Sequence, residues 1–132
     1  MNDIESEIQA KGLTAPRVTP PDIEAEISSE WYINGGDAQP DEFQPPVPAQ
    51  HPLRLLTICV LVLRNGFTVT GESACASPEN FDAEIGRKIA RQNAVNKVGP
   101  LLGFRLRDKL HARSGYGQTD AADNDKPVPD TN

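Results

Sequence analysis

Hydrophobic and polar positions change period along the chain, and these changes mark the elements of a small fold. Residues 55–64 and 67–74 are rich in apolar and β-branched side chains and meet at Asn65-Gly66, the dipeptide most typical of a two-residue hairpin turn. After residue 78, apolar side chains recur every three to four positions, which is the period of a helix. We therefore predict an α+β fold in which a β-hairpin is followed by a long helix and a second helix.

The turn also predicts which side chains share a face of the hairpin, because a two-residue type I′ turn fixes the pairing register. One face then carries Ile58, Val60, Val62, Phe67 and Val69. The opposite face carries the alternating residues of both strands, which are Thr57, Cys59, Leu61, Leu63, Thr68, Thr70 and Glu72. The first strand is thus apolar on both faces, and a single helix can cover only one of them.

The second apolar face of the hairpin needs a cover of its own. The candidates are a second copy of the chain, the amino-terminal segment around Trp31, or a host protein, and self-association requires the fewest assumptions. We therefore expect a homo-oligomer. The predicted interface residues are Cys59, Leu61, Leu63 and Trp31.

Capping residues bound the predicted helices. The long helix can begin at the Ser-Pro pair at residues 77–78 or after Asn80, and the Gly-Pro pair at residues 99–100 should end or kink it. Residues 101–110 then resume helical spacing as the second helix. The predicted buried stripe consists of Phe81, Ile85 and Ile89.

The amino-terminal segment has helical signals before a proline-rich stretch. Two acidic hexamers, DIESEI at residues 3–8 and DIEAEI at residues 22–27, can each open a short helix. Thr19 is a suitable cap for the second helix, which can dock on the core. Its apolar side consists of Ile23, Ile27 and Trp31. Residues 37–52 are proline-rich and predict an extended linker.

Composition divides the chain into three parts. Hydrophobic residues make up 37% of the 132 residues, and most of the 12 prolines lie outside residues 53–113. We expect a folded ββαα core at residues 53–113. An acidic, proline-rich arm with one or two short helices precedes it at residues 1–52, and a disordered acidic tail follows at residues 114–132.

Charge is distributed unevenly among these three parts. The arm has two basic and ten acidic residues, a net charge of −8, and the tail has one basic and four acidic residues, a net charge of −3. The core has ten basic and five acidic residues, a net charge of +5, so the chain as a whole carries −6. A basic core can attract an anionic ligand, a nucleic-acid backbone or an acidic protein surface. The alternative is an ordinary solvated surface, since +5 is modest beside the charge of a dedicated DNA-binding protein.

The predicted long helix carries the candidate binding residues. Its cationic side can hold phosphate groups through arginine side chains. Two amides fall beside Ile89 on the helical wheel, so we expect them to be partly buried and to need a hydrogen-bond partner from strand backbone, another subunit or a ligand. The predicted ligand-binding or partner-binding residues are Arg87, Arg91, Asn93, Asn96 and Lys97.

No arrangement of residues indicates catalysis, a metal or a cofactor. Cys59 and Cys75 lack metal-ligand spacing, which fits free thiols. The sequence places no histidine near a serine or cysteine that could act as a nucleophile. No apolar run reaches the length of a membrane span. We therefore expect a non-enzymatic protein without a cofactor or a membrane segment.

Three motifs in series, NGFTVTGES, NFDAEIGRKIA and NAVNK, lie between residues 56 and 110. This part of the chain resembles the family of small tailed-phage proteins named for phage N-four gene product forty-nine and phage Sf-six gene product sixty-six. The resemblance implies a phage or prophage gene whose product acts in the bacterial host cytoplasm. The family has no assigned reaction, so the resemblance implies no catalytic residues. Gly99 and Phe104 stand where the family usually has tryptophan and tyrosine.

Together these observations predict a non-enzymatic phage or prophage accessory protein that self-associates and acts on a host protein or on an anionic, nucleotide-like immune signal. Two alternatives stay open. One is a nucleic-acid-associated protein that uses the basic core, although both arms are acidic. The other is a minor virion or assembly component.

Overall fold

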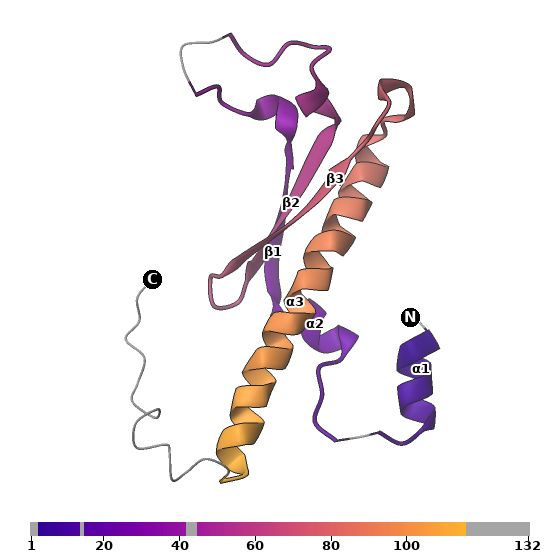
Figure 1. The fold of residues 1–132 in the computed structure, drawn as a ribbon, viewed down its shortest axis with the longest axis vertical. Helices are drawn as coiled ribbons and strands as arrows, with labels where there is room; N and C mark the ends of the chain where they lie inside the picture. Colours follow the sequence, from indigo (N-terminus) through magenta and orange to yellow (C-terminus); the bar gives the residue numbers. More distant parts are fainter. Residues whose placement is uncertain (1–2, 14, 42–44, 116–132) are drawn as a thin grey trace.

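The fold is a three-stranded antiparallel sheet with a long helix across one face (Figure 1). A computed structural model describes residues 3–13, 15–41 and 45–115. Its helices and strands are α1 (Asp3–Ala10), α2 (Pro20–Glu26), β1 (Ile27–Asn34), β2 (Leu56–Leu63), β3 (Thr68–Ala74) and α3 (Ala83–Arg113). The strand order is β1-β2-β3, which confirms the α+β class and the hairpin followed by a long helix.

The first strand comes from the segment that the sequence assigns to an arm. Thr19 caps α2 as predicted, because its hydroxyl accepts a hydrogen bond from the backbone N–H of Asp22. The helix ends at Glu26 instead of continuing to Trp31, since the following ISSEWYIN run brings aromatic and β-branched residues that favour a strand. β1 then pairs antiparallel with β2, with Trp31 opposite Val60. Residues 20–34 are therefore part of the fold. Most of the expected tail, residues 116–132, lies outside the described residues.

The hairpin turn has one residue more than predicted, and this difference exchanges the two faces of β3. The backbone N–H of Leu63 bonds to the carbonyl of Phe67, and Gly66 N–H bonds back to the carbonyl of Leu63. Only Gly66 in this turn has a positive φ, of 89°. A type I′ turn needs two positive φ values, so the loop is a three-residue connection with glycine in the left-handed position. Val69 therefore lies opposite Leu61 rather than Val62.

The core lies between β2, β3 and α3. The helix turns small residues toward the sheet, and the row that it buries is Gly86, Ala90, Ala94, Val98 and Leu102. The predicted stripe of larger residues was wrong, because Ile85 and Ile89 are about half exposed. Gly71 of β3 explains why small residues of α3 face the sheet. A Cβ placed at Gly71 would lie 2.2 Å from the backbone nitrogen of Ala94. At so short a helix-to-strand distance, isoleucine side chains have no room in the row that faces the sheet.

The predicted break at Gly99-Pro100 is also absent, and α3 is one continuous helix of 31 residues. Proline removes one backbone hydrogen bond within a helix. Here the carbonyl left without its N–H donor belongs to Asn96, which is exposed to water. Val98 and Leu102 on either side of Pro100 are buried in the core. Their burial offsets the lost hydrogen bond and keeps both halves of the helix packed on the core.

Candidate functional site

The sheet face opposite α3 is the most distinctive surface of the described residues. Because β2 is apolar in both directions, the side chains that α3 does not cover form an apolar surface. The pairing of β1 with β2 places two further large side chains on that surface. We call this surface the open face; it consists of Trp31, Ile33, Ile58, Val60 and Val62. Trp31, on the edge strand β1, is 61% exposed.

Trp31 is held in a defined orientation on the open face. Its indole N–H donates a hydrogen bond to the hydroxyl of Ser29 at 3.0 Å, and both side chains project to the same side of β1. Its polar atom therefore has a partner within the strand, and the apolar ring surface is left toward solvent. Across the sheet, β3 adds Thr68, Thr70 and Glu72 beside β2, so the rim of the apolar strip has two hydroxyl groups and one carboxylate there. An amphipathic aromatic residue in such a setting is typical of a protein-binding surface.

The other face of β1, which is turned toward α3, is tied to α2 and α3 by charged groups. Arg91 donates to Glu24 at 2.9 Å and to Glu30 at 3.0 Å. The hydroxyl of Tyr32 donates to Glu30 at 2.8 Å, and this bond, together with Arg91, lowers the pKa of the Glu30 carboxyl. Burial, and then the neighbouring Glu30, raises the pKa of Tyr32 to about 12. The cluster fixes the helix-facing side of β1 and leaves Arg91 with two carboxylate partners.

The five predicted binding residues do not converge on one site. Arg91 faces β1, as does Arg87, whose guanidinium lies 5.6 Å from the ring centre of Tyr32. Asn93 faces the other way, and its side-chain amide donates to the backbone carbonyl of Glu72 on β3 at 2.8 Å. Lys97 lies on that same flank, 3.9 Å from the Glu72 carboxylate. Asn96 is exposed and accepts a hydrogen bond from Gln92 within the helix. The two predicted buried amides are thus exposed, although Asn93 does bond to strand backbone.

Three of the four predicted interface residues are not on the surface. Cys59 and Leu61 are completely buried and Leu63 nearly so, because α3 packs directly over them. The prediction correctly treated β2 as apolar on both faces, but α3 covers the face on which it placed Cys59, Leu61 and Leu63 as interface residues. Only Trp31 is exposed, and it lies on the opposite face of the sheet. Burial also raises the pKa of the Cys59 thiol, which therefore stays protonated near neutral pH.

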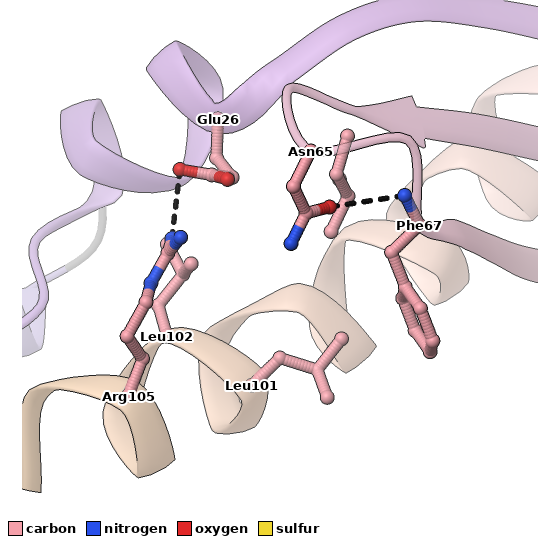
Figure 2. Close-up of a pocket in the computed structure, with 7 residues that line it drawn as sticks. Glu26, Asn65, Phe67, Leu101, Leu102 and Arg105 are labelled. Atoms are coloured by element: carbon pink, nitrogen blue, oxygen red, sulfur yellow. Dashed lines mark hydrogen bonds and ion pairs between the residues drawn. The ribbon is translucent and has the colours of Figure 1, made fainter. Parts of the chain in front are cut away.

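A shallow cavity of about 230 Å³ lies where the hairpin turn meets α3. Figure 2 shows Phe67 and Leu101 on one side of it and the Glu26–Arg105 ion pair, at 2.8 Å, on the other. Asn65 lies between them and accepts a hydrogen bond from the backbone N–H of Phe67 at 3.0 Å. Buried Leu63 and Leu102 complete the lining. An apolar cavity of this size can receive one aliphatic side chain.

Within the described ranges, no group of three or more histidine, cysteine, aspartate or glutamate side chains is arranged to hold a metal ion. None of the helices in these ranges carries an apolar stretch of the length needed to span a bilayer.

Residues 18–110 match the family described as Phage protein (N4 Gp49/phage Sf6 gene 66) family. This match covers more than half of the chain, so the protein belongs to that phage family. It begins at residue 18, before α2 and β1, which agrees with their place in the fold. No curated protein and no solved structure matches the chain.

Sequence reasoning missed Ile33 and the half-buried residues of β2 on the open face as candidate site residues. A signal was present: β2 has no polar position between Ile58 and Leu63, so one set of alternating apolar residues had to face away from any single helix. The face that stays open depends on which set the helix covers. That choice follows from Gly71, whose close contact with α3 is a property of the folded chain.

Proposed function

We propose that this phage accessory protein is a non-enzymatic binding module that captures a host protein in the bacterial cytoplasm through the open face. One observation carries the proposal: the apolar open face is left in contact with water, because the 31-residue helix α3 covers only the other face of the sheet. A small domain gains little stability from leaving Trp31 and Ile33 exposed. Apolar surface that is rimmed by polar groups marks interaction sites.

The chemistry of the open face favours a protein over an anionic small molecule. Its five members are all apolar, and its rim consists mainly of hydroxyl groups from β1 and β3. The cations that could hold a nucleotide lie on the two flanks of α3. Of these, Arg91 already has two carboxylate partners, and Lys97 lies near Glu72. A matching partner would present an apolar helix or strand that can lie flat on a sheet.

The proposal can be tested with a photo-reactive residue at position 33 during infection of the bacterial host. We expect one dominant cross-linked host protein. The matched control places the same residue at Gln92, which is exposed on α3 away from both faces of the sheet. Equal products from positions 33 and 92, or none from position 33, would contradict a docking site on the open face.

The cross-linked protein can then be purified and titrated against this chain. Trp31 is the only tryptophan, so its emission reports directly on the open face. We expect a saturable blue shift on binding, and Ile33→Glu should weaken binding at least about tenfold, because it places a charge in an apolar contact. Gln92→Glu adds the same charge elsewhere and should leave the affinity unchanged. A blue shift that follows the concentration of this chain alone would instead identify a second copy as the occupant.

A further inference from the structure

The sheet has two edges, and α3 protects only one of them. On the β3 edge, the side-chain amide of Asn93 donates to the backbone carbonyl of Glu72 at 2.8 Å, and Gly71 lets the helix come close. On the β1 edge, within the described ranges, no hydrogen bond from outside the β1–β2 ladder reaches the backbone of Glu30 or Tyr32. An uncovered edge of this kind is a template for pairing with another strand.

The ladder between β1 and β2 fixes which backbone groups lie on the β1 edge. The backbone N–H of Arg64, directly after β2, donates to the carbonyl of Glu26, directly before β1. Because bonding direction alternates along a strand, the even-numbered residues of β2 bond to β1. Their partners in β1 have odd numbers, as in the pair of Trp31 with Val60. The other residues of β1 have N–H and carbonyl groups that point out of the sheet, and these residues are Glu30, Tyr32 and Asn34.

β1 also lacks most of the features that keep sheet edges apart in soluble proteins. Its sequence, ISSEWYIN, contains neither lysine nor proline. The register shift in its pairing with β2 lies near its start, between Ile27 and Ser29. The rest of the strand is regular, so residues 29–34 can accept a further strand along their outer edge.

Two-fold symmetry limits the registers in which a second β1 can add to this edge. In an antiparallel pair related by a two-fold axis, the residue on the axis faces its own copy, and facing residues lie on the same side of the sheet. For the regular part of β1, the residue on the axis is then Glu30, Trp31 or Tyr32. With Glu30 on the axis, two carboxylates face each other, which is destabilising.

Tyr32 is the residue that suits the axis. Trp31 of each copy then lies opposite Ile33 of the other, and an aromatic residue opposite a β-branched one stabilises antiparallel sheets. These two side chains are 61% and 44% exposed in the single chain, so the pairs cover apolar surface. Glu30 lies opposite Asn34 of the other copy, and no like charges meet. With Trp31 on the axis, Ile33 would instead face a serine.

From these observations we infer that two copies of this chain join β1 to β1 as an antiparallel pair centred on Tyr32. The resulting sheet has six strands, and the outward backbone groups of both β1 strands gain partners. Both outer edges of this sheet are β3 strands, which Asn93 helps to cover, so the assembly ends at two copies. The two open faces become one continuous apolar surface, with Trp31 and Ile33 of both copies at its centre. The dimer does not depend on the proposed capture of a host protein.

The first test is the mass of the intact protein in solution. A contact between two short strands is smaller than a standard interface of about 800 Å² per partner, so we expect a dissociation constant on the order of 10 μM. At about 100 μM the mass should approach twice the chain mass of 14.3 kDa, and it should fall on dilution. A protein that stays monomeric at this concentration would overturn the inference.

The second test removes one backbone donor from the β1 edge. Glu30→Pro removes an N–H that points out of the sheet, so the hydrogen bonds between β1 and β2 are kept. It should raise the dissociation constant at least about tenfold, because two hydrogen bonds are lost across the axis. Glu30→Thr is the matched control, since it removes the same carboxylate but keeps the N–H. Circular dichroism shows whether both variants are folded, and equal dissociation constants for the two would contradict pairing through this edge.

The third test fixes the register by disulfide formation and does not require the proline variant. Two chains in a Cys75→Ser background carry Trp31→Cys and Ile33→Cys separately. In the dimer these positions face each other with about 4.5 Å between Cα atoms, which suits a disulfide. Oxidation of the mixture should give a covalent dimer. Each chain alone should not, since equal positions lie about 7–8 Å apart on the diagonal.

Other cross-linking patterns would contradict this arrangement. A covalent dimer from Trp31→Cys alone would place Trp31 on the axis and overturn the register. Val60→Cys is the control for a second copy stacked on the open face, because β2 does not touch the other copy in the proposed sheet. A covalent dimer from Val60→Cys would therefore overturn the pairing of edges.

The two proposals fail separately. A photo-reactive residue at position 33 gives a product of twice the chain mass with a second copy, and a product containing a host sequence with a captured protein. If Trp31 emission shifts with the concentration of this chain, Glu30→Pro keeps that shift only when a second copy covers the open face. A dimer without a host product removes the host-protein proposal alone, and a host product from a monomeric wild-type chain removes the dimer alone.

Discussion

The two faces of the sheet are built from the same strand but have different roles. On one face, Leu61 and Cys59 are completely buried beneath α3, and Gly71 lets the helix backbone come close. On the other face, Val60 and Ile58 alternate with them along β2, but their cover consists only of strand neighbours such as Trp31. Hydrophobicity along β2 is nearly uniform. What distinguishes the faces is the small residues that face the covered side from α3 and β3.

This difference indicates how a chain of modest size keeps an apolar surface free for binding. Glycine and alanine in the buried row of α3 bring helix and sheet so close that a few leucine and valine side chains complete the core. Folding then does not require that the open face be buried. The comparison predicts that substitutions on the covered face change stability strongly, whereas those on the open face change it little.

The largest effect is expected at Gly71. In Gly71→Ala the new Cβ would meet backbone atoms of Ala90 and Ala94, which cannot move without shifting the whole helix. We expect a loss of about 3 kcal/mol or more of unfolding free energy. Urea denaturation followed by circular dichroism measures it. Gly103→Ala is the control, because nothing lies within 4 Å of a Cβ there, and it should stabilise the helix by about 0.5–1 kcal/mol. Equal effects at the two glycines would disprove the close contact.

The next largest effect on stability is expected at one of two neighbouring residues on β2 whose side chains point to opposite faces of the sheet. Leu61→Ala removes a completely buried side chain and should cost about 3 kcal/mol. Val60→Ala removes a partly exposed one from the open face and should cost about 1 kcal/mol or less. Thermal and urea denaturation of the purified variants provide the values. If Val60→Ala proved as costly as Leu61→Ala, the open face would be covered within the folded protein.

Much of the fold follows from local sequence signals. Asn65-Gly66 correctly located the hairpin, Thr19 correctly located the start of α2, and spacing after residue 78 correctly gave a helix. The family resemblance was confirmed by the match over residues 18–110. These features depend on a few adjacent residues, which is why they can be recognised without knowledge of the packing.

The errors concern features that depend on distant contacts. The third strand was missed because β1 is preceded by a capped helix whose apolar spacing continues through Ile27 and Trp31. The hairpin register was wrong by one residue, and Val69 was therefore placed on the wrong face. The buried row of α3 was assigned to Ile85 and Ile89, since hydrophobicity outweighs small size in a periodicity argument. Packing against β2 and Gly71 decided the first and the last case, and the three-residue turn at Gly66 decided the register.

A smaller effect should appear when the pH is changed. The folded Glu30 carboxyl has a lowered pKa, so its contribution to stability is present above its ordinary value of 4.5 and is lost as the pH falls through the folded value. Because this side chain is 40% exposed, we expect less than about 1 kcal/mol. Stability measured between pH 6 and pH 3 should fall less steeply in Glu30→Gln. Parallel curves for the two proteins would mean that Glu30 does not hold β1 to α3.

Tyr32 should give the corresponding effect at high pH. Its pKa is raised to about 12 in the folded protein, so the stability that it contributes is complete below about pH 10 and is lost as the pH rises toward 12. Ultraviolet absorbance should show one tyrosine titrating near pH 12 in the folded protein. In Glu30→Gln this titration should move to lower pH, because the neighbouring negative charge is removed. Burial of the ring remains, so the shift should be partial.

The smallest effect on stability is expected at the most exposed apolar residue of the open face. Trp31→Thr replaces the tryptophan by another good strand former and should change the unfolding free energy by no more than about 0.5 kcal/mol. Val69→Thr makes a similar change on the covered face and should cost about 1–3 kcal/mol, because it buries a hydroxyl. Both values can be read from urea denaturation by circular dichroism. A large loss in Trp31→Thr would mean that the tryptophan supports the sheet, and its exposure would then need no binding partner to explain it. A negligible loss leaves binding as the physical reason for a tryptophan that is 61% exposed on an apolar surface.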